Sequence, residues 1–187
     1  DNYAWLKDEN WQKVMRTPSL LKAEISEYLN AENSYAERIL ASSKKLQNQI
    51  FNEMKDRIAK NDMSVPLMDG DYIYFKKFVG EDQYPKFYRK NRDGTKEKLI
   101  LDCTKEAKGR AFFNLGDVEH SPDHNVLAYS VDYEGSEVFS IYFRDVDTGV
   151  HLESQIEGTN GKFKWSEDSL SILYVSVDEA FRPYSVK

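Results

Sequence analysis

The sequence predicts an α+β fold, in which a helical N-terminal extension over residues 1–68 precedes an incomplete β-propeller over residues 69–187. Two observations predict this division. Apolar residues recur with helical spacing in the first part, whereas the second part consists of short runs of Tyr, Phe, Val and Ile that are separated by turn residues. The second part also repeats itself, which is typical of the antiparallel four-stranded blades of a propeller.

The composition describes a folded, soluble chain and argues against several classes of partner. The 187 residues contain 32 acidic and 26 basic side chains, and the net charge of −6 disfavours nucleic acid. The aromatic content of 13% is too high for a disordered chain, and the apolar runs are too short to cross a membrane. Because Cys103 is the single cysteine, no internal disulfide can form, and we expect a reducing, cytoplasmic location.

Two amphipathic helices are expected in the first part. Thr17 followed by Pro18 is a typical helix start, and apolar residues then recur with helical spacing over residues 18–31. A longer helix is expected over residues 33–60, with a bend at Ser42-Ser43. The aromatic segment at the N-terminus, residues 1–6, is expected to pack against another surface.

The second part contains two full repeats and the start of a third. Residues 72–94 overlay residues 127–149 without a gap at an offset of 55, which places Tyr74 on Tyr129, Phe87 on Tyr142 and Arg89 on Arg144. Residues 121–129 overlay residues 166–174 at an offset of 45. The sequence therefore predicts the first two to three blades of a propeller, and propellers typically carry about four to eight. The exposed edges of such a partial ring should promote self-association.

No catalytic, metal-binding or cofactor-binding centre is recognisable in the sequence. Residues 120–124, His-Ser-Pro-Asp-His, contain the residue types of a serine-hydrolase triad, but adjacent residues in a turn point in different directions, which favours a structural turn. The same segment lacks the spacing of metal ligands and nominates no fourth ligand. Residues 145–149 and 158–162 depart from the calcium-loop and phosphate-loop patterns. Cys103 is interpreted as a small residue near the end of a strand.

An acidic group lies on the loop between two strands of the second repeat and consists of Asp132, Glu134 and Glu137. Its charge would attract a basic partner or a cationic peptide. The alternative is an ordinary solvated loop, and the residues alone leave both interpretations open.

Several segments of the chain resemble the prolyl oligopeptidase family, and in particular its oligopeptidase B, or protease II, branch. Residues 1–10, Asp-Asn-Tyr-Ala-Trp-Leu-Lys-Asp-Glu-Asn, are similar to the opening segment of that family, and residues 28–33, Tyr-Leu-Asn-Ala-Glu-Asn, to one of its helix ends. Similarity to the oligopeptidase B branch lies in residues 53–58, Ser64-Val65-Pro66, Leu115-Gly116 and Ser121-Pro122-Asp123-His124. The match spans the whole chain in the expected order.

The resemblance implies a larger enzyme, in which a helical extension, a complete propeller and a C-terminal α/β-hydrolase domain with a Ser-Asp-His triad cleave short peptides. The oligopeptidase B branch cleaves after Arg or Lys. The chain aligns only with the extension and the opening blades, so no triad residue has a counterpart here and the chain alone is expected to be inactive. The implied partners are the hydrolase domain of the parent chain and, in the full enzyme, short basic peptides.

The same resemblance implies roles for two groups of residues at the interface with the hydrolase domain. Tyr3, Trp5 and Leu6 are expected to pack along that domain. The loop that carries Glu137 is expected to approach the interface, where a carboxylate would pair with an arginine and bias opening against closing.

Two other interpretations remain open from the sequence. The chain would then belong either to a non-enzymatic propeller that serves as a protein-interaction module, or to a free-standing small β-domain with a helical hairpin that oligomerises. The reading frame beyond residue 187 distinguishes them, because the peptidase requires a later Gly-x-Ser-x-Gly motif.

Overall fold

A computed structural model describes all of residues 1–187 and divides them into two compact units, Asp1–Ala59 and Lys60–Lys187. The sequence predicts a boundary after residue 68. The difference arises from two short strands, β1 (Asp62–Met63) and β2 (Leu67–Asp69), because both pair with β3 (Tyr72–Phe78) and so belong with the sheets.

The first unit contains only helices and loops. Its elements are η1 (Ala4–Leu6), α1 (Trp11–Arg16), η2 (Pro18–Leu20), α2 (Ala23–Leu40), η3 (Ala41–Ser43) and α3 (Lys44–Asp56). Pro18 opens the 3-10 turn η2 and not the long α-helix, which begins at Ala23. The predicted break near residue 32 is also wrong, since α2 runs through it without interruption.

The bend that the sequence predicts at Ser42-Ser43 is confirmed, and it separates α2 from α3. The hydroxyl of Ser43 donates a hydrogen bond to the carbonyl oxygen of Leu40 at 2.8 Å. Serine side chains that bond to nearby carbonyls compete with the helical pattern and bend helices. The local chemistry therefore explains why the break lies at residues 41–43.

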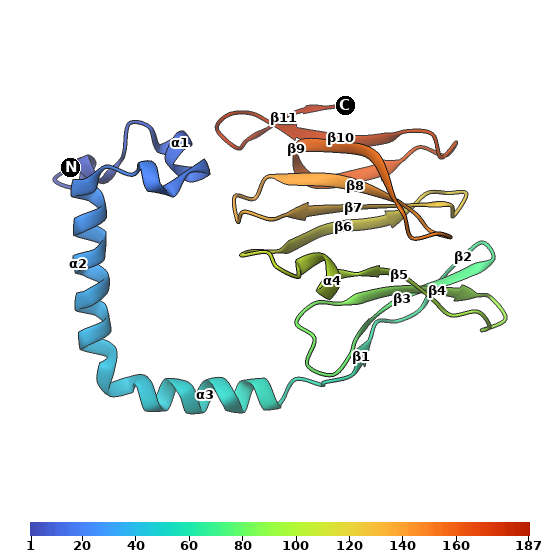
Figure 1. The fold of residues 1–187 in the computed structure, drawn as a ribbon, viewed down its shortest axis with the longest axis horizontal. Helices are drawn as coiled ribbons and strands as arrows, with labels where there is room; N and C mark the ends of the chain where they lie inside the picture. The colour runs from blue at the N-terminus through green and yellow to red at the C-terminus, as the bar shows by residue number, and fades with distance from the viewer. The chain divides into compact units, whose positions relative to one another are not determined.

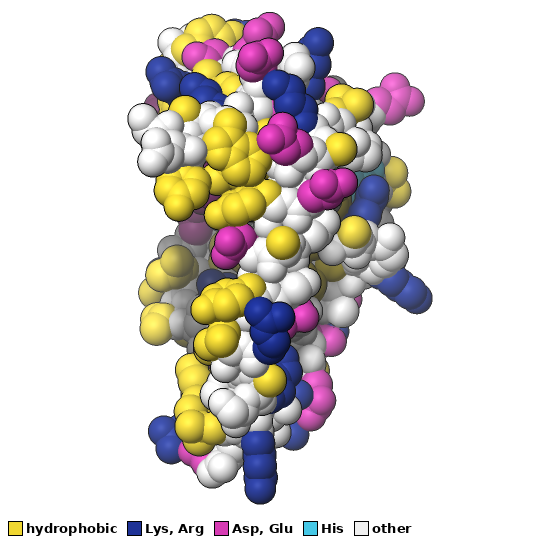
Figure 2. Space-filling model, turned by 90° about the vertical axis from the view of Figure 1, so that its left-hand side faces the viewer, with side chains coloured by type: hydrophobic (Ala, Val, Ile, Leu, Met, Phe, Trp, Pro, Cys, Tyr) yellow, Lys and Arg dark blue, Asp and Glu magenta, His cyan; other side chains and the backbone are white.

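The apolar stripe that predicts these helices is largely exposed in α2 and α3. Ile25 is the one buried hydrophobic residue of the first unit. Large apolar side chains with high exposure are Tyr35, Ile39, Leu40, Leu46, Ile50, Phe51 and Met54. Figure 2 shows hydrophobic side chains interspersed with charged ones on the face that it draws. No helix of the chain combines the length and the apolar character that crossing a membrane requires.

The second unit begins with one antiparallel sheet in which β2, β3, β4 (Lys86–Asn91) and β5 (Lys98–Asp102) follow one another in order. β1 pairs with the far end of β3. The helix α4 (Cys103–Ala107) follows β5 and leads to the next sheet (Figure 1). This meander of four neighbouring strands is the first blade that the sequence predicts.

The next sheet is six-stranded and contains the second blade and the beginning of a third. Its strands are β6 (Asn114–His120), β7 (Val126–Asp132), β8 (Phe139–Asp145), β9 (His151–Trp165), β10 (Ile172–Val177) and β11 (Pro183–Val186), paired in that order (Figure 1). The N-terminal part of β9 pairs with β8 and its C-terminal part with β10. β9 is thus both the last strand of one blade and the first strand of the next.

A glycine allows β9 to change direction at this transition. Gly161 has a φ of 83°, and a Cβ atom at this position would lie 2.9 Å from the ring of Phe139. The carbonyl oxygen of Gly161 accepts a hydrogen bond from the buried hydroxyl of Ser130 at 2.8 Å. A larger residue would therefore be strained in its backbone and would displace the neighbouring ring.

The central strand β7 is buried on both of its faces. On one face Leu127, Tyr129 and Val131 join a core with Ile100 and Leu101 of β5, and Cys103, Phe113 and Val146 complete that core. On the other face Ala128 packs with Ile141 of β8 and Phe163 of β9. Stacking of one sheet between two neighbours is what a propeller requires, and the predicted fold class is confirmed. Cys103 lies directly after β5, near a strand end as the sequence predicts, and it is buried.

The overlay at an offset of 55 matches the strands of the two repeats but not their faces. Tyr74 and Tyr129 both pack in the first core, although equivalent residues of successive blades should lie in successive cores. The overlay at an offset of 45 is in phase, because Leu127 lies in the first core and Ile172 packs against the second. A shift of one residue reverses every side chain of a strand, so the first overlay is wrong by such a shift.

The stacked cores predict a large loss of stability when a side chain of β7 is shortened. Leu127 is 1% exposed, and we expect Leu127→Ala to lower the free energy of unfolding by about 2–5 kcal/mol. Leu170, which is 84% exposed, provides a matched control, and Leu170→Ala should change it by no more than about 0.5 kcal/mol. Urea unfolding followed by tryptophan fluorescence measures both. Equal effects of the two substitutions would contradict the arrangement of the core.

Candidate functional site

The loop between β7 and β8 carries the acidic group that the sequence identifies. Asp132 is 2% exposed, and its carboxylate accepts hydrogen bonds from the backbone N–H groups of Glu134, Gly135 and Glu137 at 2.8–2.9 Å. All three bonds are local, so Asp132 organises the loop and is not available to a partner. Of the three predicted residues, only Glu134 and Glu137 present exposed side chains.

Glu137 occupies an unusual position on this rigid loop. Its φ of 60° lies in the left-handed region, which non-glycine residues adopt only where the surroundings hold them there. The side chain is exposed and lines a pocket of about 370 Å³ together with Asn114, Ser136, Phe139 and Asn160. The loop thus holds a carboxylate beside a pocket with both polar and aromatic walls.

The N-terminal residues that the sequence assigns to an interface lie in and around η1. The ring of Trp5 contacts Tyr28 of α2 edge-on at 5.2 Å and remains 41% exposed, whereas Tyr3 is 62% exposed. Asp8 anchors the segment, because its carboxylate accepts hydrogen bonds from the N–H groups of Asn10 and Lys22. These two bonds lower the pKa of Asp8. The segment is therefore held in place and still presents aromatic surface.

Residues 120–124 form the structural turn that their sequence favours. The Ser121 hydroxyl donates to Asp123 at 2.6 Å and accepts from the N–H of Val126, while Asp123 also accepts from the N–H of Asn125. The hydrogen bond from Ser121 is the main reason why the pKa of Asp123 is lowered. Neither histidine of the segment bonds to the Ser121 hydroxyl, so no triad exists here.

The structure brings a third residue to the two histidines of this turn. Asp69, at the end of β2, lies with its Oδ2 3.4 Å from Nε2 of His120, and the ligand atoms of Asp69, His120 and His124 lie within 4.8 Å of one another. Tyr74 completes the cluster, since its ring stacks on His120 at 3.9 Å and its hydroxyl shares a hydrogen bond of 2.9 Å with Nδ1 of His124.

We call these four residues, Asp69, Tyr74, His120 and His124, the Asp69 cluster, and burial shifts the pKa of two of them. Burial of the imidazole lowers the pKa of His120. Burial also raises the pKa of Tyr74 to about 12, although the nearby Arg89 acts in the opposite direction. His120 is thus held neutral and Tyr74 protonated at pH 7. Sequence reasoning missed Asp69 and Tyr74, because no local pattern connects the first repeat to the turn of the second.

A buried arginine ties the first blade to the second next to this cluster. Arg89 is 6% exposed and donates hydrogen bonds of 2.7 Å to the carbonyl oxygen of His124 and to the carboxylate of Asp147. Its guanidinium also lies 4.3 Å from the centre of the Tyr72 ring. Charge-assisted bonds of this kind are stronger than neutral ones, so the junction between the blades is well fixed.

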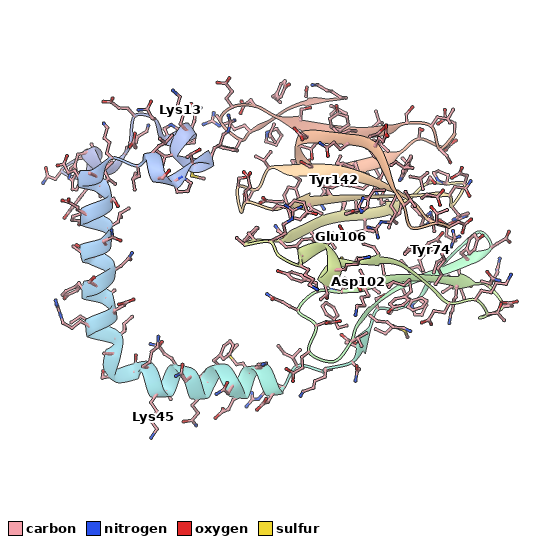
Figure 3. The ribbon with its side chains drawn as sticks, in the orientation of Figure 1. Lys13, Lys45, Tyr74, Asp102, Glu106 and Tyr142 are labelled. Carbon is pink, nitrogen blue, oxygen red and sulfur yellow. The ribbon has the colours of Figure 1, made fainter.

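A second polar junction lies farther along the same interface. Arg144 of β8 donates to Glu106 of α4 at 2.6 Å, and both side chains are largely buried. Figure 3 labels Glu106 and Tyr142, which come from α4 and β8, and Tyr74 from β3. Tyr74 and Tyr142 both pack against the first core. The polar groups of this interface thus serve to join the sheets.

Comparison with known proteins identifies the architecture. The family model described as the N-terminal β-propeller domain of prolyl oligopeptidase matches residues 1–186. The chain belongs to the prolyl oligopeptidase family. Dipeptidyl aminopeptidase BI of Pseudoxanthomonas mexicana is 30% identical to this chain over 95% of residues 1–187. Protease 2 of Moraxella lacunata is 29% identical to it over 98% of these residues.

Solved structures place this prolyl oligopeptidase-family chain near oligopeptidase B. Oligopeptidase B from Leishmania major superposes on the whole chain with a TM-score of 0.87 and 30% sequence identity. Oligopeptidase B from Trypanosoma brucei, solved in a closed form with covalently bound antipain, gives a TM-score of 0.82 and 31% identity. The chain covers 26% of both curated relatives and 25–26% of these two structures, so it spans about a quarter of their length.

The role of Asp132 as an organiser of the loop predicts a stability effect. We expect Asp132→Asn to lower the free energy of unfolding by about 1–3 kcal/mol, because an amide nitrogen replaces a buried carboxylate oxygen that accepts backbone N–H bonds. Glu134→Gln removes the same charge from the same loop at an exposed position and should leave stability nearly unchanged. Chemical unfolding of both variants measures the difference, and equal stabilities would contradict this role.

Proposed function

We propose that the chain is the helical extension and the opening blades of an oligopeptidase B-like serine peptidase that cleaves short peptides after Arg or Lys. In this proposal the chain supplies scaffold and gate, and the chemistry lies in an α/β-hydrolase domain outside residues 1–187. The match of the N-terminal propeller domain to residues 1–186 carries the proposal. The chemistry is placed outside these residues because Ser121 and Asp123, which are of the residue types of a catalytic triad, bond instead to each other and to the backbone of their turn.

The proposed gate is the loop that carries Glu137. The buried Asp132 fixes the loop, and the exposed carboxylate of Glu137 stands at the rim of a pocket. A fixed loop holds the carboxylate in one place. An arginine of the hydrolase domain could then pair with it in the closed arrangement of the two domains and not in the open one. The net charge of −6 also favours the approach of basic peptides.

Tyr3, Trp5 and Leu6 are proposed to pack against the hydrolase domain. Tyr3 and Trp5 are 62% and 41% exposed. Aromatic side chains are enriched in protein interfaces, so these two rings offer a surface for a partner domain to cover.

A cytoplasmic location belongs to the same proposal. Cys103 is buried and free, and as the single cysteine it needs no oxidising compartment.

The direct test is peptide hydrolysis by the full-length protein that contains this chain. We expect turnover of chromogenic peptides that end in Arg or Lys at P1, weaker turnover of matched peptides with Ala or Pro, and loss of activity with a serine-directed inhibitor. Absence of turnover with every peptide would favour the non-enzymatic propeller. Preference for a neutral P1 residue would retain the peptidase and reject the specificity.

The gating role predicts a kinetic effect of Glu137 in the full-length protein. Glu137→Gln should change kcat/KM by roughly fivefold or more, which is the lower end of typical coupling between two states. Stability should be little affected, because the side chain is exposed. Glu134→Gln is the matched control and should leave the kinetics unchanged. Equal kinetics of both variants and wild type would retire Glu137 as a gate residue.

The interface role of the N-terminal segment predicts a docking effect. Trp5→Ala should weaken association of the first unit with the remainder of the protein, measured as earlier loss of the unit in limited proteolysis. The unfolding of the sheets should not change, because Trp5 contributes to neither of their cores. Trp11→Ala, in α1 of the same unit, is the control. Wild-type proteolysis of the Trp5 variant would remove the proposed contact.

A further inference from the structure

We propose that Asp69, His120 and His124 bind a divalent transition-metal ion, with Zn²⁺ as the best candidate. Two imidazoles and one carboxylate are a common protein ligand set for zinc, which then keeps an open position for water. The three residues come from two successive blades, since Asp69 ends β2 and the histidines flank the turn between β6 and β7. All of them lie in the second compact unit.

The distances within the cluster suit a shared ion. Zinc lies about 2.0–2.2 Å from nitrogen and oxygen ligands, so two tetrahedral ligands are roughly 3.4 Å apart. Nε2 of His120 and Oδ2 of Asp69 are separated by 3.4 Å, and all three ligand atoms lie within 4.8 Å of one another. An ion placed between them requires only small side-chain adjustments, because no two of the ligand atoms are more than 4.8 Å apart.

The hydrogen bonds of His120 leave the correct nitrogen available. Its Nδ1 lies 3.0 Å from the carbonyl oxygen of Ser121, which can only accept, so Nδ1 carries the proton. The lone pair of the neutral ring is then on Nε2, the atom that faces Asp69. Metal-binding histidines typically donate their other N–H to a carbonyl or carboxylate in this way. His124 has an outer partner of its own in Tyr74.

The chain contains an internal comparison for His124. The turn at residues 166–170 repeats the turn at residues 121–125, with Ser166 bonded to Asp168 as Ser121 is to Asp123. His124 and Ser169 occupy the equivalent position, and both have a φ of 64°. Because the third blade makes the same turn with serine, the turn does not require an imidazole. The histidine at this position instead places a ring against Asp69 and His120.

The surroundings permit an ion and its water ligands. Asp69 and His120 line a cavity of about 1000 Å³, which gives water access to the open positions. The neighbouring Arg89 is engaged by Asp147 and by the carbonyl oxygen of His124. Asp69 therefore has no arginine partner and remains free to neutralise a metal. The imidazole nitrogens favour Zn²⁺, Cu²⁺ or Ni²⁺ over Mg²⁺ and Ca²⁺.

A bound ion would act as a clamp between the first two blades. It would join the inner strand of one sheet to the turn of the next, beside the ion pair of Arg89 with Asp147. An ion that binds only the folded state stabilises that state, and the stabilisation grows with the logarithm of the ion concentration once this exceeds the Kd. The proposed role of the ion is therefore to join two blades, and this role is independent of the proposed peptidase activity.

The test is metal binding by the full-length protein after removal of any affinity tag and treatment with EDTA. Titration calorimetry with Zn²⁺ should show one ion bound per protein chain. Addition of Co²⁺ in place of Zn²⁺ should give the visible absorption bands of a protein-bound Co²⁺ ion. Loss of a residue that only supports a metal ligand typically weakens metal binding by about tenfold or more. Asp69→Asn, His120→Gln and His124→Ser remove the ligands themselves, so each should weaken binding by more than about tenfold. His124→Ser is the mildest of these, because the chain itself uses serine at the equivalent turn position.

Two matched controls separate this site from surface binding. Asp71→Asn removes the same charge two residues from Asp69, and His151→Gln removes the third histidine of the chain. Both variants should bind Zn²⁺ as the wild type does, and Zn²⁺ should raise the melting temperature of the controls but not of the three site variants. Circular dichroism without metal checks that each variant folds. Absence of binding by the wild type, or equal binding by the folded His124→Ser variant, would overturn the proposal.

Discussion

Burial of β7 on both faces is the constraint on which the second unit depends. Leu127, Tyr129 and Val131 fill one interface, whereas the opposite face carries the small residues Ala128 and Ser130. The small face lets β9 approach closely enough for the Ser130 hydroxyl to reach the carbonyl oxygen of Gly161. Each sheet therefore needs a neighbour on both sides, since a single sheet cannot bury two apolar faces.

The same constraint explains where the charged residues of the interface lie. Arg89 and Arg144 reach across the first interface from opposite sides, one to Asp147 of the second sheet and the other to Glu106 of α4. A buried charge is costly unless it is paired and hydrogen-bonded, and Arg89 meets this condition with a carboxylate, a carbonyl oxygen and an aromatic face. The interface thus tolerates charged groups where each one has a partner of opposite charge.

Periodicity and turn residues were enough to predict the fold class from the sequence, because each strand and turn is encoded locally. Two features were not predictable in the same way: the core that each face of a strand meets, and the distant residues that come together between blades. The gapless overlay of Tyr74 on Tyr129 aligns the strands but misplaces their faces, since both rings pack in the same core although successive blades should fill successive cores. Asp69 is equally invisible to local patterns, because only the stacking of two blades brings it to His120. The bend at Ser43 was predictable, since its hydroxyl acts on Leu40 in the same turn.

A comparison of acidic side chains shows how burial separates structural from functional roles in this chain. Asp132 and Asp123 spend their oxygens on backbone N–H groups of their own turns, and such local bonds leave nothing to offer a second molecule. Glu137 stands on the loop that Asp132 holds, and Asp69 ends the paired strand β2, yet both residues are exposed. Rigid support beneath a free charge is what preorganised recognition requires. In sequence the four residues look alike, and only their hydrogen bonds tell the supports from the groups that they support.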